Sequence, residues 1–159
     1  MSLMKKLSLS LSSFVILILF NILFVYSSEK NIVKGRAIII DGDTIKINNE
    51  KIRFGGIDAP ERGIVGHKLS KEKLKKKIGN NLINCIREKN KDYWKRTVAE
   101  CFINDESLSS FMVINGYACD YVKYSKKKYA KEQQYAKTKK LGIWNMKFNL
   151  NWEKKCKKK

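Results

Sequence analysis

Side chains that bind transition metals are scarce in this chain of 159 residues. It has a single histidine, His67, and none of its four cysteines lies three positions from another. Because zinc sites are built from closely spaced Cys and His side chains, a zinc site is not expected. The chain also lacks internal repeats, and its length suits one domain with one hydrophobic core.

Acidic residues are scarce as well, with 15 Asp and Glu against 34 Lys and Arg and a formal net charge of +19. A domain this basic attracts polyanions, of which nucleic acid is the commonest. Only five of the basic residues are Arg, which favours sequence-independent attraction over readout of particular bases. A lysine-rich surface that is merely solvated would explain the same composition.

One long apolar run is present, from Leu7 to Tyr26, and Lys5 and Lys6 precede it. This layout is typical of a secretory signal, so residues 1–27 are predicted to be a signal peptide. The run also approaches the ~20 residues that span a bilayer, which leaves an uncleaved membrane anchor as the alternative. In both cases the rest of the chain is expected to work outside the cytoplasm, as a secreted or periplasmic protein or one anchored facing outward.

The pattern of β-branched residues and turns predicts an α+β domain over residues 28–152, followed by a basic tail at 153–159. Strands are predicted at 38–40, 44–47, 52–54, 82–87 and 97–103. Helices are predicted at 67–79, 107–115 and 126–140. Five strands and three helices fit a small OB-fold-type β-barrel with helices packed on it.

Two acidic turns stand at the ends of neighbouring predicted strands. Asp41 and Asp43 form the first turn, and Asp58 and Glu61 flank the single proline, Pro60, in the second. Taken one by one, such acids are ordinary caps and solvated corners. Taken together, they place hard oxygen ligands where Ca²⁺ or Mg²⁺ would bind, with backbone carbonyls and water completing the site.

Arg53 lies on the strand that leads into the second turn, and Arg96 begins a later strand. Surface pairing with the acids is one interpretation of both residues. The other is that they bind phosphate, because a planar guanidinium holds two phosphate oxygens at once. A cation, a carboxylate that orients water and two such arginines would suffice to hydrolyse a phosphodiester.

The order of these residues resembles the signature of the staphylococcal nuclease (thermonuclease) family. Its first part is matched by IDGDT at 40–44, Arg53 and IDAPE at 57–61. Three later segments of this chain resemble later parts of the signature: DYWKRTVA at 92–99, NGYA at 115–118 with the tyrosines after it, and LGIW at 141–144. The resemblance covers residues 33–152 and implies a five-stranded OB-type barrel with three helices.

The resemblance also implies a calcium site. Asp43 and Asp58 would bind Ca²⁺ through their carboxylates and Ala59 through its carbonyl, with Asp41 close to the metal. The catalytic residues would be Arg53, Glu61 and Arg96. Glu61 would orient or deprotonate the attacking water, and the arginines would stabilise the pentacoordinate phosphate.

Tyr121 and Tyr124 would lie beside the nucleotide, although packing at a helix edge is an equal interpretation of both. The family has Tyr-Gly where this chain has Trp94 and Lys95. A glycine there often has a positive φ, which lysine adopts at a cost, so the placement of Arg96 is in question.

Exported relatives often have cysteines near two of the cysteine positions of this chain, which suggests a disulfide between Cys85 and Cys101. These two residues fall on the strands that flank the 92–96 loop. Cys119 and Cys156 are expected to be unpaired, and His67 is expected to be the exposed start of a helix.

The sequence therefore predicts a monomeric, calcium-dependent nuclease that acts on DNA or RNA. One alternative is an inactive module of the same family that only binds nucleic acid; it is disfavoured because Asp43, Asp58, Glu61, Arg53 and Arg96 are all present. Another is a membrane-surface protein whose lysines contact anionic lipid beside an N-terminal anchor. That alternative explains the charge but leaves the ordered acids unexplained.

Overall fold

The computed structural model describes residues 13–19 and 31–146. Residues 13–19 are helical and exposed. Within the described residues, no helix is long and apolar enough to cross a membrane. The predicted boundaries after residues 27 and 152, the basic tail and Cys156 lie outside the described residues.

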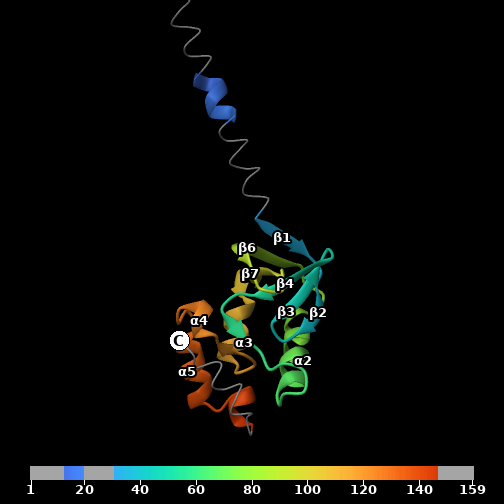
Figure 1. Ribbon diagram of the computed structural model, residues 1–159, viewed down its shortest axis with the longest axis vertical. Helices are drawn as coiled ribbons and strands as arrows, with labels where there is room; N and C mark the ends of the chain where they lie inside the picture. Colours follow the sequence, from blue (N-terminus) through green and yellow to red (C-terminus); the bar gives the residue numbers. More distant parts are fainter. Residues whose placement is uncertain (1–12, 20–30, 147–159) are drawn as a thin grey trace, which may run out of the picture. The chain divides into compact units, whose positions relative to one another are not determined.

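Most strands of residues 31–146 belong to one sheet, in which neighbouring strands follow the order β1-β6-β7-β4-β3-β2 while β8 pairs with β7. Its strands are β1 (Ile32–Gly35), β2 (Ile38–Asp41), β3 (Thr44–Ile47), β4 (Glu50–Phe54), β6 (Ile83–Lys91), β7 (Thr97–Ile103) and β8 (Glu106–Ser107). β5 (Ile57–Asp58) and β9 (Cys119–Asp120) form a separate antiparallel pair. The sheet curls into a half-barrel with helices beside it (Figure 1), so the predicted α+β, OB-type fold is confirmed.

The first three predicted strands correspond to β2, β3 and β4, which form an antiparallel meander. β4 then pairs in parallel with β7, with Arg53 beside Val98. Side chains of β7 alternate strictly between buried and half-buried positions, as expected for a strand with one face on the core. The parallel pairing places the end of β4, where the second acidic turn begins, beside the start of β7, where Arg96 stands.

The helices are α2 (His67–Ile78), α3 (Leu108–Ile114), α4 (Val122–Ser125) and α5 (Ala130–Thr138), followed by the 3₁₀ helix η1 (Gly142–Asn145). The helix predicted at 126–140 is wrong at its start. Lys126 and Lys127 have φ values of 55° and 69°, a left-handed conformation that separates α4 from α5. The short helix α4 went unpredicted because four residues are too few for a helical period.

Cys85 and Cys101 face each other in the antiparallel pairing of β6 with β7 and are joined by a disulfide. They are the pair that the family resemblance suggested. The expectation that Cys119 is unpaired is wrong, because Cys119 is also disulfide-bonded. Sequence patterns do not reveal cysteine pairing, which depends on distances in the folded chain.

Candidate active site

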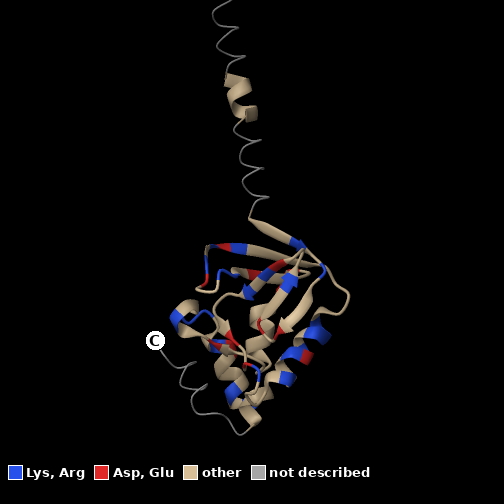
Figure 2. Ribbon diagram, turned by 45° about the vertical axis from the view of Figure 1, so that its right-hand side comes forward, with Lys and Arg blue, Asp and Glu red and all other residues tan. Residues whose placement is uncertain are grey.

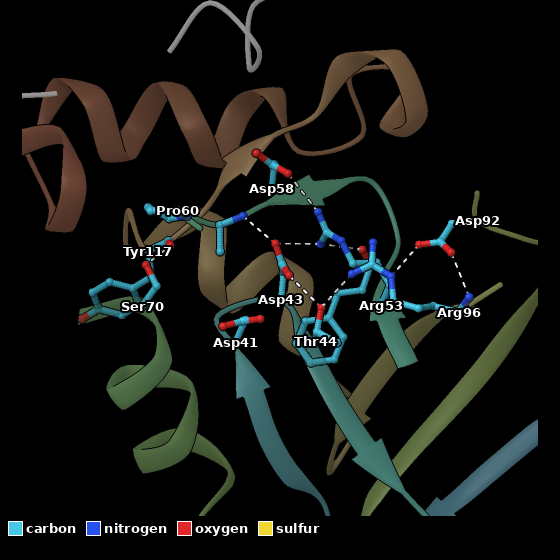
Figure 3. A network of polar contacts seen from close by, with 12 residues as sticks. Asp41, Asp43, Thr44, Arg53, Asp58, Pro60, Ser70, Asp92, Arg96 and Tyr117 are labelled. Atoms are coloured by element: carbon cyan, nitrogen blue, oxygen red, sulfur yellow. Dashed lines mark hydrogen bonds and ion pairs between the residues drawn. The ribbon is translucent and has the colours of Figure 1, made fainter. Parts of the chain in front are cut away.

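The two acidic turns come together at one end of the β2–β4 meander (Figure 3). Asp43 and Asp58 are 4% and 1% exposed. Asp43 Oδ2 accepts a hydrogen bond from the Ala59 backbone N–H at 2.7 Å, and its Oδ1 accepts one from Thr44 Oγ1 at 2.9 Å. These bonds hold the first turn against the second, so residues from both turns contribute to one site.

Arg53 lies between the two buried carboxylates. Its two terminal nitrogens lie 2.8 Å from Asp43 Oδ2 and 3.0 Å from Asp58 Oδ1. The strand register explains this placement, because Arg53 on β4 pairs with Thr44 on β3, next to Asp43. A guanidinium held at both ends in this way has a fixed orientation, which is the condition for two-pronged binding of phosphate.

The oxygen atoms at this place fit calcium chemically. Among the described residues, no group of three His, Cys, Asp or Glu side chains is arranged to hold a metal ion. However, Asp41, Asp43 and Asp58 with the Ala59 carbonyl supply the hard oxygen donors that Ca²⁺ prefers. One guanidinium charge is divided between two carboxylates here, which favours a further cation beside Asp43.

His67 contacts both acidic turns, because its Nδ1 is 3.1 Å from the Pro60 carbonyl oxygen and 3.8 Å from Asp41 Oδ1. The expectation that His67 is exposed is wrong, because its side chain is mostly buried by these contacts. It helps to join the start of α2 to the acidic turns. Ser70 on α2 donates a hydrogen bond to the Tyr117 carbonyl at 2.5 Å, which joins α2 to the segment between α3 and β9.

Arg96 follows the turn between β6 and β7, and Asp92 fixes it. Asp92 accepts hydrogen bonds from the Arg96 backbone N–H at 2.8 Å and from Arg96 Nε at 2.6 Å. Burial opposes ionisation of Asp92, but these bonds outweigh it and lower the pKa of Asp92. Lys95 has a φ of 59°, so this chain adopts the conformation that glycine permits in the family pattern.

Arg96 is also linked to the acidic turns. Its NH1 lies 3.5 Å from Thr44 Oγ1, the same hydroxyl that donates to Asp43. Asp92 and Thr44 were not predicted as site residues. Both stand inside the motifs that resemble the family signature, and this position could have identified them as site residues.

A pocket of about 530 Å³ opens beside this network. Among the residues that line it are Arg53, Asp58, Glu61, Arg96, Tyr121 and Tyr124. Six of the predicted site residues therefore line one cavity. The sequence had not predicted this cavity. Asp41, Asp43 and Ala59 are not among the residues that line the cavity.

The two predicted tyrosines that line the pocket are Tyr121, between β9 and α4, and Tyr124, within α4. Their rings pack edge to face with centroids 4.9 Å apart, and Tyr124 is exposed. The backbone N–H of Tyr121 donates to the Gly56 carbonyl at 2.9 Å. Gly56 has a φ of 70° and no room for a Cβ against Ser125, so a glycine is needed for this close approach.

Comparison with known proteins agrees with this arrangement. The chain matches the staphylococcal nuclease homologue family over residues 51–146, more than half of its length. A Haemophilus influenzae protein named as an uncharacterized endonuclease is 33% identical over 138 residues, which cover 81% of this chain and 75% of that protein.

Two further relatives are similar in sequence to this chain. The succinoglycan biosynthesis protein ExoI of Rhizobium meliloti is 31% identical over 121 residues, 69% of this chain and 63% of its own length. The probable staphylococcal-like nuclease CAN4 of Oryza sativa subsp. japonica is 28% identical over 127 residues, 77% of this chain but 26% of its own length. With the matching fold and motifs, these similarities show that the chain belongs to the staphylococcal nuclease homologue family.

Proposed function

We propose that this protein is a calcium-dependent nuclease that hydrolyses phosphodiester bonds in DNA, RNA or both. The observation that carries the proposal is the position of Arg53, which is held between Asp43 and Asp58 and faces a pocket that Glu61 and Arg96 also line. Relatives whose names include endonuclease and staphylococcal-like nuclease support the same reaction class.

In this proposal each residue has one task. Arg53 and Arg96 bind the non-bridging oxygens of the scissile phosphate and stabilise the negative charge that develops there. Glu61 orients a water molecule for attack on phosphorus and accepts its proton, while the bond between phosphorus and the leaving sugar oxygen breaks and that oxygen takes up a proton from solvent. Asp43, Asp58 and the Ala59 carbonyl would hold Ca²⁺, with Asp41 nearby. When bound, the ion would act as a Lewis acid on a phosphate oxygen.

The charge of the rest of the chain suits a polyanionic substrate. Lys and Arg are spread over helices and strands alike, and α2 alone carries six lysines (Figure 2). Because lysine acts as a point charge, this distribution favours binding to the phosphate backbone of a nucleic acid, whatever its base sequence. We propose that the protein acts as a monomer outside the cytoplasm, either released after removal of residues 1–27 or anchored by them.

The test is cleavage of plasmid DNA and of a long RNA by the purified protein, with Ca²⁺ and with EGTA. We expect cleavage with Ca²⁺ and none with the chelator. Binding is measured in parallel at several salt concentrations and should weaken steeply as salt rises. Tight, salt-sensitive binding without cleavage in Ca²⁺ would instead identify a module that only binds nucleic acid.

A further inference from the structure

The turn between β6 and β7 displays two large aromatic side chains to solvent. Tyr93 is 90% exposed and Trp94 is 72% exposed, and both line the pocket that contains Arg53 and Glu61. Large aromatic rings are usually buried, because their exposure to water is unfavourable. Exposed rings at the edge of a cavity indicate a surface that binds a ligand.

Contacts within the turn support the two rings. The Lys95 N–H donates to the Asp92 carbonyl at 3.0 Å and the Asp92 N–H to the Arg96 carbonyl at 3.1 Å, which closes the turn. The Arg96 guanidinium lies over the Trp94 ring with its carbon 5.0 Å from the centroid. Tyr93 packs edge-on against Trp94, with centroids 5.6 Å apart and planes at 90°.

We propose that Trp94, supported by Tyr93 and Arg96, is a stacking site for one unpaired nucleobase of the substrate strand. The proposal rests on the nuclease function, because it takes a nucleic-acid strand as the ligand of the pocket. Every base has a flat π-face, so stacking adds affinity without selecting a sequence. Trp94 comes from a different part of the chain than Tyr121 and Tyr124, which line the same pocket from the residue before α4 and from α4 itself.

The chemistry at Trp94 fits this ligand better than it fits a phosphate. The indole is an apolar plane with a single donor, so it adds little to phosphate binding that Arg96 does not already supply. A base on the exposed side of the ring would extend the stack that begins with the guanidinium. Bases in an intact duplex are stacked on each other, so an unpaired base is the form that this site accepts.

The experiment compares binding of two octamers to the full protein in EGTA, so that no cleavage occurs. One octamer is oligothymidylate, and the other has the same phosphates but abasic sugars. We expect Trp94→Ala to weaken oligothymidylate binding roughly tenfold while leaving abasic binding unchanged. Trp94→Phe, which retains an aromatic face, should keep most of the affinity. Tyr135→Ala is the matched control, because Tyr135 is exposed on α5 and does not line the pocket.

Each outcome has a meaning. Equal weakening for both octamers would show that Trp94 only positions Arg96, and no weakening would show that it has no role; either result overturns the stacking site. Failure of the wild-type protein to bind either octamer would also overturn the stacking site. Base-dependent binding that needs Trp94, in a protein that fails to cleave plasmid with Ca²⁺, would refute the nuclease function and leave the stacking site standing.

Discussion

The two arginines of the pocket are held in different ways. Arg53 belongs to the buried network of Asp43, Arg53 and Asp58, which we call the floor, and its side chain is 11% exposed. Arg96 belongs to the rim, the turn of residues 92–96, and is 24% exposed with one carboxylate partner, Asp92. Removing one member of a buried ion network leaves uncompensated charge, whereas a partly exposed pair that solvent can reach contributes less to folding. The floor should therefore serve both folding and chemistry, and the rim chemistry alone.

Glu61 gives the largest expected effect. It lines the pocket but is exposed, so its role should be chemical rather than structural. We expect Glu61→Gln to lower the cleavage rate by about 10²- to 10⁴-fold, while the free energy of unfolding changes by less than about 0.5 kcal/mol. Initial rates with Ca²⁺ and urea unfolding measure the two quantities. Glu88→Gln, at another exposed acid of the same pocket, is the control and should keep most of the rate.

The comparison of floor and rim is tested directly by removing each arginine. Arg53→Ala should lower the free energy of unfolding by about 3–5 kcal/mol, because Asp43 and Asp58 stay buried without it. Arg96→Ala should lower it by less than about 1 kcal/mol. Urea unfolding in EGTA measures both, with Arg53→Lys as a variant that keeps the charge but loses the two-pronged contact. Equal losses at the two positions would refute the distinction.

Asp120 shows what a buried carboxylate does without a guanidinium partner. It pairs across from Ile57 and is fully buried. Burial raises the pKa of Asp120, and Glu132 adds to this, while the nearby Ser125 hydroxyl opposes it. The folded protein therefore favours the protonated form of Asp120.

It follows that the contribution of Asp120 to stability is greatest in acid and falls as pH rises through its raised pKa. Asp120→Asn should remove this loss and stabilise the protein at pH 7 by about 1–3 kcal/mol. The gain should shrink towards zero below the pKa of an unfolded Asp, about 3.9. Urea midpoints of the wild-type protein and of Asp120→Asn, measured from pH 7 to below about 3.9, test this prediction. A stabilisation by Asp120→Asn that grows in acid would contradict it.

The smallest expected effect concerns the rim turn. Lys95 has a positive φ, which is unfavourable for a residue with a Cβ. Lys95→Gly should therefore raise the free energy of unfolding by up to about 1 kcal/mol, and Arg96 should stay in place because Asp92 holds it. Lower stability in urea, or a loss of cleavage, would show that the lysine side chain has a role in the turn.

Much of the site was predictable because its residues stand in short motifs. The acids at 41–43 and 58–61 and the strands that precede them were predicted from alternation and turn chemistry. The cost of Lys95 was foreseen from the absence of glycine. The functional roles of these acids remain predictions, and Glu61→Gln tests one of them. The break between α4 and α5 was missed because the polar pattern from 126 to 140 continues a helix that the backbone at Lys126 and Lys127 does not form.

The local sequence was enough to determine the longer strands, the acidic turns, the basic charge and the kinds of side chain in the site, but not the two-residue strands β5, β8 and β9. Only the tertiary structure decided which of them meet. The register of β3 with β4 placed Arg53 between two acids, and the parallel pairing of β4 with β7 brought Arg96 to the same cavity. The burial of Asp120 and the pairing of Cys119 were decided in the same way. Contacts between residues far apart in sequence depend on how whole strands pack together, and no short stretch of sequence contains that information.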